Sequence, residues 1–269
     1  MKLGRIDYLN CYPFYYHMLE RKPLPDVDLY PRLPSELNRL MTEGGLDLSP
    51  VSAAAYADLA GSAVLLPEFC IGSKGPVGSV ILISKVPIER LDGRTLALTS
   101  ASRTSVTLLK IILKKFYCAE PEYVQSGPAP SLKKYDAAVV IGDHAMTPEA
   151  DNAPYRYDLG ELWLEKTGRP VVFAVFAAGK AAVAADPEGI KAAAGSYKAS
   201  LRCLAEERRA LVAAAERAYP SVTCDVDAYF SGLRYDFTDE MQDALRFYLS
   251  AGAKLGLLKE VKELEFLKP

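Results

Sequence analysis

One short stretch of the chain, LTSASRTSVTLLKIILKKF at residues 98–116, places several hydroxyl side chains in front of an apolar segment with helical spacing. Its polar residues before that segment are Thr99, Ser100, Ser102, Arg103, Thr104 and Ser105. A Ser or Thr at the start of a helix accepts hydrogen bonds from backbone N–H groups that otherwise lack partners. Hydroxyls, free N–H groups and a guanidinium are also the donors that hold a carboxylate or phosphate. The stretch therefore predicts either helix capping alone or an anion-binding site.

Four other stretches carry polar or glycine residues beside predicted strands. They hold, in chain order, Asn10 in YLNCYP, Ser52 in LSPVS, Gly78 and Ser79 in GPVGSV, and Gly142 and Asp143 in VVIGDHAM. Each has an interpretation that needs no ligand, since Asn10 can form a turn and Ser52 or Asp143 can cap a helix. The glycines permit a hairpin bend as well as close approach of the backbone to a ligand. Their common position at strand ends favours a binding cleft.

The composition excludes several classes of function. The 269 residues carry a net charge of −2, so the chain has no basic field for nucleic acid or an anionic membrane. The first residues lack the apolar segment of a secretory signal, and no run of about 18 apolar residues could span a membrane. The five Cys form no C-x-x-C pair, and two His are too few for a zinc site. We therefore expect a cytoplasmic protein with no metal, no cofactor, no nucleic acid and no membrane partner.

Strand-like and helix-like segments alternate through the first two thirds of the chain, which indicates an α/β fold with a largely parallel sheet. We expect strands at residues 3–9, 27–33, 46–52, 63–69, 78–84, 95–100, 121–125, 136–143 and 170–179. Helices are expected at residues 12–20, 34–45, 53–61, 104–117 and 158–168, and from Pro187 the pattern is helical nearly to the end. The expected helix caps are Ser35, Asp158, Asp225 and Thr238, with Gly44 and Gly168 as helix stops.

A division into two lobes is indicated at residues 85–93, KVPIERLDG, where proline and charges interrupt the apolar pattern. A second strand–helix series begins there, and the strand at 170–179 can carry the chain back to the first lobe. We expect lobe 1 at residues 1–88 and 176–269, with the C-terminal helices, and lobe 2 at residues 89–175. Two lobes joined by two crossings resemble the type II periplasmic-binding-protein fold, in which the ligand lies in the cleft between the lobes.

Six segments in this order resemble the chorismate dehydratase family of the futalosine route to menaquinone. They are GRIDYLNCYP, ELNRLMTEGGLDLSPVS, GPVGSVILIS, SRTSVTLLKIIL, AAVVIGDHAM and DLGELWLEKTGRPVVFAVF, and the likeness runs from residue 3 to about residue 178. Two positions depart from the family pattern: Ala53 stands where a second hydroxyl after Ser52 is common, and Phe176 stands where Trp is usual. These departures bear on the shape of the cleft and not on the class of protein.

The resemblance implies a hydro-lyase that eliminates water from chorismate, its small-molecule substrate, to give 3-[(1-carboxyvinyl)oxy]benzoate without cofactor or metal. It places Asn10 and Ser79 beside the reacting ring as catalytic residues, where they would hold the geometry while the substrate's own enolpyruvyl carboxylate takes the proton. The hydroxyls and N–H groups of residues 102–105 are expected to hold a carboxylate, in preference to the guanidinium of Arg103. The full expected substrate-binding set is Ser52, Gly78, Thr99, Ser102, Arg103, Thr104, Ser105, Gly142 and Asp143.

Two other functions stay open at this point. A cytoplasmic small-anion binding or sensor protein would share the fold, and ligand binding without turnover would identify it. The sibling enzyme of the pathway, which acts on cyclic dehypoxanthine futalosine, would be expected to use an ionisable base such as a His, whereas YLN and SRTSV match the dehydratase better. His144 follows Asp143, and a buried His at a helix start is more often structural than catalytic. The Ala-rich C-terminal helices are compatible with lobe packing or with a homodimer contact.

Overall fold

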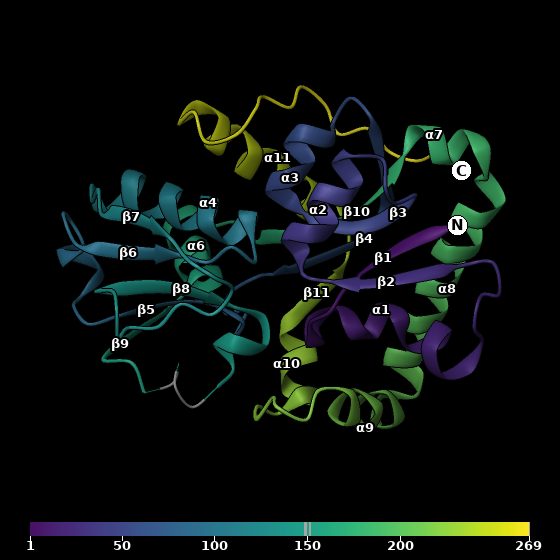
Figure 1. Cartoon of the computed structure of the whole chain (residues 1–269), viewed down its shortest axis with the longest axis horizontal. Helices are drawn as coiled ribbons and strands as arrows, with labels where there is room; N and C mark the ends of the chain where they lie inside the picture. Colours follow the sequence, from purple (N-terminus) through teal and green to yellow (C-terminus); the bar gives the residue numbers. More distant parts are fainter. Residues whose placement is uncertain (148–149, 151, 269) are drawn as a thin grey trace.

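Two β-sheets lie in separate halves of the molecule, each flanked by helices, in the computed structural model (Figure 1). The structure describes residues 1–147, 150 and 152–268. Within these residues the first sheet has six strands and the second has five. The predicted α/β fold with a helical C-terminal region is confirmed. The expectation of a largely parallel sheet is wrong, because both sheets combine parallel and antiparallel strand pairs.

The first sheet is assembled from both ends of the chain, in the strand order β11-β4-β10-β3-β1-β2. Its strands are β1 (Lys2–Ile6), β2 (Asp28–Arg32), β3 (Leu48–Ser52), β4 (Ala63–Ser73), β10 (Val171–Gly179) and β11 (Leu233–Asp236). β1 pairs in parallel with β2 and β3, whereas β10 runs antiparallel between β3 and β4. Helices α1 (Tyr12–Tyr16), α2 (Pro34–Thr42) and α3 (Ala53–Leu59) follow the first three strands. The polar residues after β1 and at the end of β3 therefore meet at one edge of this sheet.

The second sheet has the strand order β7-β6-β8-β5-β9. Its strands are β5 (Val80–Ser84), β6 (Thr95–Leu98), β7 (Glu122–Gln125), β8 (Ala137–Ile141) and β9 (Tyr155–Asp158). β6 is parallel to β7 and β8, and β5 is antiparallel to β8 and β9. Helix α4 (Arg103–Ile112), which continues into a π-helical turn at Leu113–Tyr117, follows β6, and α6 (Leu159–Thr167) follows β9. Because β5 and β8 run in opposite directions, the start of β5 lies beside the end of β8.

The chain changes sheets earlier than the sequence pattern suggested. Strand β5, which falls inside the expected lobe 1 of residues 1–88, pairs with β8 and β9 in the second sheet. All of β10 pairs with the first sheet, starting with Val171 opposite Ser73. We therefore propose lobe limits that follow the sheets, with the first crossing between β4 and β5 and the second between α6 and β10.

Four helix boundaries confirm the predicted capping chemistry. The carboxylate of Asp158 accepts hydrogen bonds from the N–H groups at the start of α6, and Gly168 ends that helix at a φ of +69°. Asp225 caps α10 (Val226–Gly232) and Thr238 caps α11 (Asp239–Lys254), each through its side chain. A short polar side chain at the N-cap accepts hydrogen bonds from N–H groups of the first turn that have no partner within the helix. This local chemistry is why the three N-caps could be predicted from the sequence.

The start of α2 differs from the prediction. Leu33 is the N-cap residue and Pro34 occupies the first turn, so Ser35 lies inside the helix and is not its cap. Proline fits this position because its fixed φ suits a helix and its missing N–H would have had no partner there. Glu36 compensates for the missing hydroxyl cap by accepting a hydrogen bond from the N–H of Leu33, at 3.3 Å.

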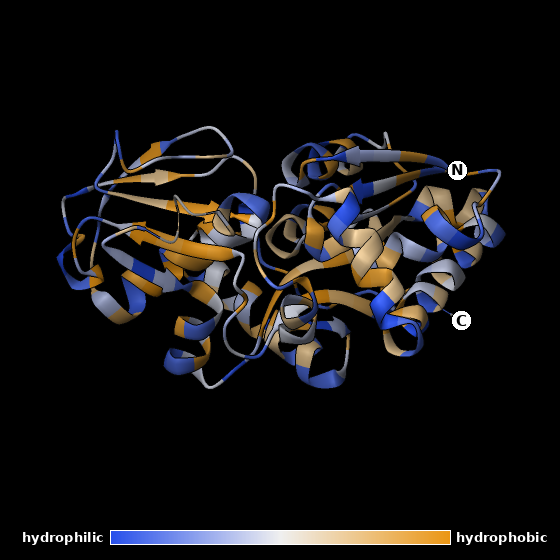
Figure 2. Ribbon diagram, turned by 90° about the horizontal axis from the view of Figure 1, so that it is seen from below, coloured by the Kyte–Doolittle hydropathy of each residue, from blue (hydrophilic) through white to orange (hydrophobic). Residues whose placement is uncertain are grey.

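The C-terminal helices cover the first sheet and reach the second. They are α7 (Lys180–Ala185), α8 (Pro187–Glu206), α9 (Arg208–Ala218), α10 and α11. α8 packs against α1, and α11 contacts both β10 of the first sheet and α4 beside the second. A single apolar cluster joins the two halves, and Figure 2 shows hydrophobic strands inside each of them. Across the part of the chain that the structure describes, no helix has both the length and the apolar character to span a membrane.

Candidate functional site

A small cavity of about 40 Å³ lies between the two halves, at the strand ends that the sequence singled out. Its polar lining residues are Tyr8, Asn10, Ser52, Ser79, Ser102 and Ser105, and Gly142 also lines it. The remaining lining residues are apolar or proline, so no charged side chain of the described residues lines the cavity. The structure therefore brings together residues from five separate stretches of the sequence, and the groups that they present to a ligand are neutral.

The start of α4 supplies two of the hydroxyls. Ser102 is the N-cap residue, and its Oγ accepts a hydrogen bond from the N–H of Ser105 at 3.2 Å. The two Oγ atoms are also 3.0 Å apart and share a hydrogen bond. Both side chains are buried, at 8% and 1% exposure. The same hydroxyls thus cap the helix and line the cavity, so capping and anion binding are compatible functions of this stretch.

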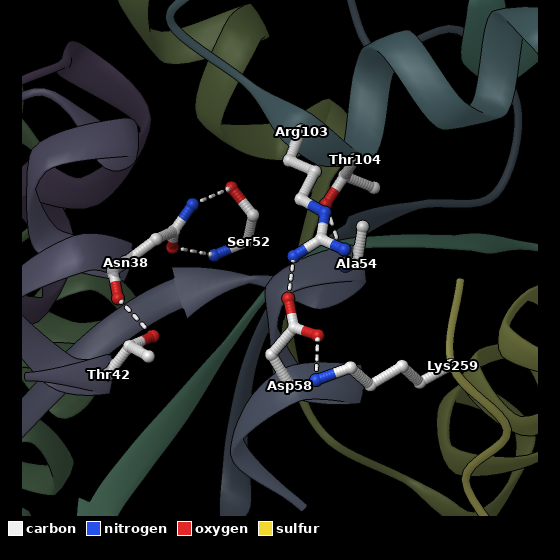
Figure 3. A network of polar contacts seen from close by, with 8 residues as sticks. All are labelled: Asn38, Thr42, Ser52, Ala54, Asp58, Arg103, Thr104 and Lys259. Carbon is white, nitrogen blue, oxygen red and sulfur yellow. Dashed lines mark hydrogen bonds and ion pairs between the residues drawn. The ribbon is translucent and has the colours of Figure 1, made fainter. Parts of the chain in front are cut away.

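Ser52 also lines the cavity and is the N-cap residue of α3. Its side chain makes no capping bond to α3, and Asn38 of α2 contacts it twice (Figure 3). The Asn38 side chain accepts a hydrogen bond from the Ser52 N–H at 2.9 Å and donates one to the Ser52 Oγ at 3.1 Å. Because the Oγ accepts from Asn38, its own proton is left to be donated to a group in the cavity. Asn38 was not predicted, although it lies inside one of the family-like segments.

The turn after β1, a 3₁₀ helix at Leu9–Cys11, positions Tyr8 and Asn10 at the cavity. The Tyr8 hydroxyl and the Asn10 Oδ1 are buried and have no hydrogen-bond partner among the described residues. The Tyr8 ring packs directly on Gly142, where an added Cβ would lie 2.8 Å from the ring. Gly142 also has a φ of +58°, so both the close approach and the backbone require glycine.

Ser79 is held by a residue that the sequence did not indicate. Ser79 is 1% exposed, and its Oγ accepts a hydrogen bond of 2.8 Å from the hydroxyl of Tyr229. Tyr229 comes from α10, 150 residues further along the chain and in the other half of the molecule. Burial raises the pKa of the Tyr229 hydroxyl well above its ordinary value, although hydrogen bonding with Ser79 and Asn10 lowers it. Tyr229 therefore stays protonated and acts as a donor near both predicted catalytic residues.

Asp143 does not line the cavity but fixes the turn that carries Tyr8 and Asn10. Its Oδ1 accepts a hydrogen bond from the N–H of Leu9 at 3.2 Å. Burial raises the pKa of Asp143 to about 6, against the lowering effects of the Leu9 N–H and the neighbouring His144. Burial and the charge of Asp143 in turn raise the pKa of Tyr8 to about 12. His144 itself is exposed, contrary to the expectation of a buried structural histidine.

Arg103 points away from the cavity. Its guanidinium forms an ion pair with Asp58 of α3, and Lys259 binds the other carboxylate oxygen of Asp58 at 3.1 Å (Figure 3). Burial would raise the pKa of Asp58, but the hydrogen bonds and charges of the two cations outweigh it and lower the pKa. This geometry agrees with the expectation that hydroxyls, and not the guanidinium of Arg103, face the ligand. It does not agree with the inclusion of Arg103 in the expected substrate-binding set.

Two of the predicted hydroxyls hold the protein together instead of lining the cavity. Thr104 donates to the carbonyl of Phe173 at 2.9 Å and accepts from the N–H of Ala54 at 3.2 Å, and it is fully buried. Thr99 donates to the carbonyl of Pro128 at 2.9 Å and accepts from the N–H of Ala101 at 3.1 Å. The hydroxyls of Thr104 and Thr99 therefore each donate one hydrogen bond and accept one within the protein.

Gly78 belongs to the turn that connects the two sheets. It has a φ of +74°, and its N–H donates to the Asp158 carboxylate at 2.7 Å. The same carboxylate accepts from the N–H of Val77. Gly78 lines a neighbouring cavity of about 350 Å³, on the other side of Tyr229 from Ser79. Its role is to shape the turn that delivers Ser79.

The chemistry of the cavity follows from these groups. Hydroxyls at the start of a ten-residue helix, with its N–H dipoles behind them, suit a carboxylate of a ligand. In the part of the chain that the structure describes, no His, Lys or carboxylate side chain lines the cavity, so this lining offers no strong proton acceptor. Among the described residues there is no group of three His, Cys, Asp or Glu side chains that could hold a metal ion.

Residues 1–254 match the model of a protein family described as menaquinone biosynthesis. The chain is 37% identical to a chorismate dehydratase of Thermus thermophilus over 192 residues, which is 65% of this chain and 68% of that protein. It is 27% identical to the 1,4-dihydroxy-6-naphthoate synthase of the same organism over 64% of this chain and 63% of that protein. About one third of each protein lies outside these alignments.

Solved structures share the fold at low sequence identity. A protein of Archaeoglobus fulgidus matches with a TM-score of 0.74 and 19% identity over 96% of this chain and 98% of that one. The periplasmic aliphatic sulphonate binding protein SsuA of Escherichia coli matches with a TM-score of 0.71 and 12% identity over 100% of this chain and 92% of that one. At these identities the likeness establishes a periplasmic-binding-protein-like fold and nothing about the ligand.

Proposed function

Because the chain belongs to the menaquinone biosynthesis family, we propose that it is a chorismate dehydratase, which removes water from chorismate to give 3-[(1-carboxyvinyl)oxy]benzoate. The observation that carries the proposal is the convergence of Asn10, Ser52, Ser79, Ser102 and Ser105 on one cavity. These residues come from the segments that resemble the family. The Thermus thermophilus relative that is 37% identical is a chorismate dehydratase.

The neutral donors of the cavity are suited to a substrate with two carboxylates. We propose that one carboxylate of chorismate binds at the start of α4, where Ser102 and Ser105 present hydroxyls and the helix dipole favours negative charge. Ser52 donates its proton from the facing wall. Asn10 and Ser79, at the end of the cavity near Tyr229, then lie beside the ring.

The reaction breaks a C–H bond beside the enolpyruvyl ether and the neighbouring C–O bond of the hydroxyl, and the ring becomes aromatic. The proton goes to a base, the C–H electron pair forms the new ring double bond, and the hydroxide leaves. Since the described lining residues include no His, Lys or carboxylate, we propose that the enolpyruvyl carboxylate of the substrate takes the proton. Asn10 and Ser79 would then act by orientation, an effect that can lower a barrier by roughly 7–11 kcal/mol.

Asp143 is the nearest alternative base, with a pKa of about 6. Its carboxylate is outside the cavity lining and accepts a hydrogen bond from Leu9, so its position favours a structural role. We propose that it holds the Tyr8–Asn10 turn and does not exchange protons with the substrate.

The reaction class would be a carbon–oxygen lyase, a hydro-lyase, and the pathway would be the futalosine route. We expect a cytoplasmic location because chorismate is the proposed substrate. We also expect that the C-terminal helices serve mainly lobe packing, which is supported by the contacts of α8 with α1 and of α11 with β10.

The direct test is incubation of the purified, metal-stripped protein with chorismate, followed by liquid chromatography and mass spectrometry. We expect a product that is lighter by one water and has benzoate-type absorbance, and we expect Ser79→Ala to reduce its rate. Unchanged chorismate with folded protein would contradict the proposal. Turnover of cyclic dehypoxanthine futalosine would then indicate the sibling enzyme, and tight anion binding without turnover would indicate a sensor.

A further inference from the structure

The hydroxyl of Ser79 is held from the other half of the molecule. Tyr229 on α10 donates to the Ser79 Oγ at 2.8 Å, and the exposed fractions of the two side chains are 9% and 1%. A phenol is more acidic than an aliphatic alcohol and is therefore the natural donor of this pair. With its oxygen accepting from Tyr229, Ser79 has its own proton to donate to a substrate oxygen.

The surroundings of Tyr229 fix it in this position. Its ring packs on Gly78, where an added Cβ would lie 3.7 Å from the ring carbon. It also packs on the neighbouring Phe230, with ring centroids 6.0 Å apart. Tyr229 lines the cavity of about 350 Å³, whereas Ser79 lines the small cavity. The Tyr229–Ser79 hydrogen bond thus joins one lining residue of each cavity.

We propose that Tyr229 is a positioning residue, which orients Ser79 for catalysis only when the two halves of the molecule are closed on each other. The proposal rests on the dehydratase function proposed above and extends it to a residue outside the segments that resemble the family. Tyr229 lines the outer cavity and not the small one, so it acts through Ser79 and not by contact with the reacting ring.

The test is a mutant cycle on Tyr229→Phe, Ser79→Ala and the double variant, with chorismate as substrate. Phenylalanine keeps the ring and removes only the hydroxyl. We expect kcat of Tyr229→Phe to fall by about 10- to 100-fold, because loss of orientation at a reacting group has effects of this size. We expect KM to change by less than about threefold, and the double variant to have the kcat of Ser79→Ala alone.

The matched control is Tyr235→Phe on β11. Tyr235 is also buried and its hydroxyl has no partner among the described residues, but it does not line the small cavity. We expect this variant to keep the wild-type kcat. Binding of the benzoate product, measured by calorimetry, is a second readout that does not depend on turnover, and Tyr229→Phe should bind it as the wild type does.

Several results would overturn the proposal. Wild-type kcat in Tyr229→Phe would do so, and so would a double variant whose loss is the product of the two single losses. Loss of product binding would show that Tyr229 maintains the cavity and does not orient Ser79. If Tyr229→Phe does not fold, the double variant, which lacks both partners of the bond, still allows comparison with Ser79→Ala. Failure of the wild type to convert chorismate would instead remove the dehydratase function, and this proposal with it.

Discussion

At the residue scale, the described residues that line the cavity carry neutral groups, and several of these are hydroxyls with a second, structural partner. Ser102 combines two functions, because its Oγ caps α4 and lines the cavity. A substitution at Ser102 that keeps the helix cap but changes the cavity lining separates these two functions. Aspartate is as good an N-cap as serine, whereas alanine is a poor one.

We predict that Ser102→Asp keeps the free energy of unfolding within about 0.5 kcal/mol of the wild type, whereas Ser102→Ala loses about 1 kcal/mol. Both should weaken chorismate binding, Ser102→Ala by about tenfold and Ser102→Asp by more, because its carboxylate repels that of the substrate. Urea unfolding and steady-state kinetics give the two quantities. Normal kinetics in the stable Ser102→Asp variant would show that Ser102 is a helix cap only.

Asp143 gives a prediction about pH. Its pKa is raised by burial to about 6 in the folded protein, against an ordinary value of 3.8, so the folded state holds the proton more tightly between these pH values. Stability therefore falls as the pH rises through this range, by about 2–3 kcal/mol when the group is fully ionised. Asp143→Asn removes the charge and keeps an acceptor for Leu9. We expect it to be more stable than the wild type at pH 8 and equal to it near pH 4.

The control for this prediction is Asp136, whose pKa is lowered by hydrogen bonds from the backbone and side chain of Thr95. The pH dependence of stability has the opposite sign for Asp136, since the ionised form of its side chain is the one that stabilises the fold. Asp136→Asn should therefore be less stable than the wild type at pH 8, with a difference that shrinks as the pH falls below 4. Urea unfolding at several pH values measures both. The same pH dependence in the two variants would refute the assignment for Asp143.

We predict that replacing tyrosine by phenylalanine changes the stability of the protein differently at two buried positions. The Tyr8 hydroxyl has no partner among the described residues, whereas that of Tyr248 donates to the carbonyl of Thr104 at 3.1 Å. Tyr248→Phe removes this buried hydrogen bond and should cost about 0.5–1.5 kcal/mol, and Tyr8→Phe should cost nothing or stabilise the protein. Thermal unfolding of both variants decides this. An equal loss in the two would mean that Tyr8 has a partner in solution.

At the element scale, a single carboxylate joins a helix start to the crossing between the sheets. Asp158 accepts from the N–H groups of Gly160 and Glu161 at the start of α6 and from those of Val77 and Gly78 in the turn before Ser79. The cap of α6 and the path of the chain into β5 therefore depend on the same buried side chain. Asp225 offers a comparison, since it caps α10 through the N–H of Ala228 and no further bond of its carboxylate is described.

We predict that Asp158→Ala lowers the free energy of unfolding by about 3 kcal/mol, because several buried N–H groups lose a charged acceptor. Asp225→Ala should lose only about 1 kcal/mol, the usual cost of an N-cap. Chemical unfolding of the two variants makes the comparison. Equal losses would show that Asp158 is no more than a helix cap.

Local chemistry explains which elements and site residues could be predicted from the sequence. The caps Asp158, Asp225, Thr238 and Ser102 accept hydrogen bonds from N–H groups only two or three residues further along the chain, so the local pattern contains the information. The sheet to which β5 belongs could not be predicted in this way, because its residues are buried and apolar and would suit either sheet.

The roles of the long-range residues could not be predicted either. Arg103 was assigned to the substrate, but its partner Asp58 comes from the other half of the molecule. Tyr229 meets Ser79 only because α10 folds back over the first crossing, and nothing around residue 229 in the sequence indicates this contact. In both cases the decisive partner is distant in the chain, and it becomes visible only in the folded arrangement.

At the scale of the whole molecule, the two halves are closed on each other around the cavity. Hydrogen bonds cross between them at Leu9 and Asp143 and at Tyr229 and Ser79, and the ion pair of Arg103 with Asp58 crosses as well. The cavity of about 40 Å³ is small beside the roughly 300–1,000 Å³ typical of small-molecule sites. Binding of chorismate therefore requires the halves to separate or the cavity to widen before they close again.

The order of strands in the first sheet has a consequence for synthesis on the ribosome. The second sheet uses a continuous part of the chain, from β5 to β9, so it can form while later residues are still being made. In the first sheet β10 lies between β3 and β4, so these two strands keep unpaired edges until residue 179 has emerged. Such edges pair readily with other chains. The nascent protein thus passes through a stage in which the edges of β3 and β4 are exposed, and a chain that stops before β10 should aggregate.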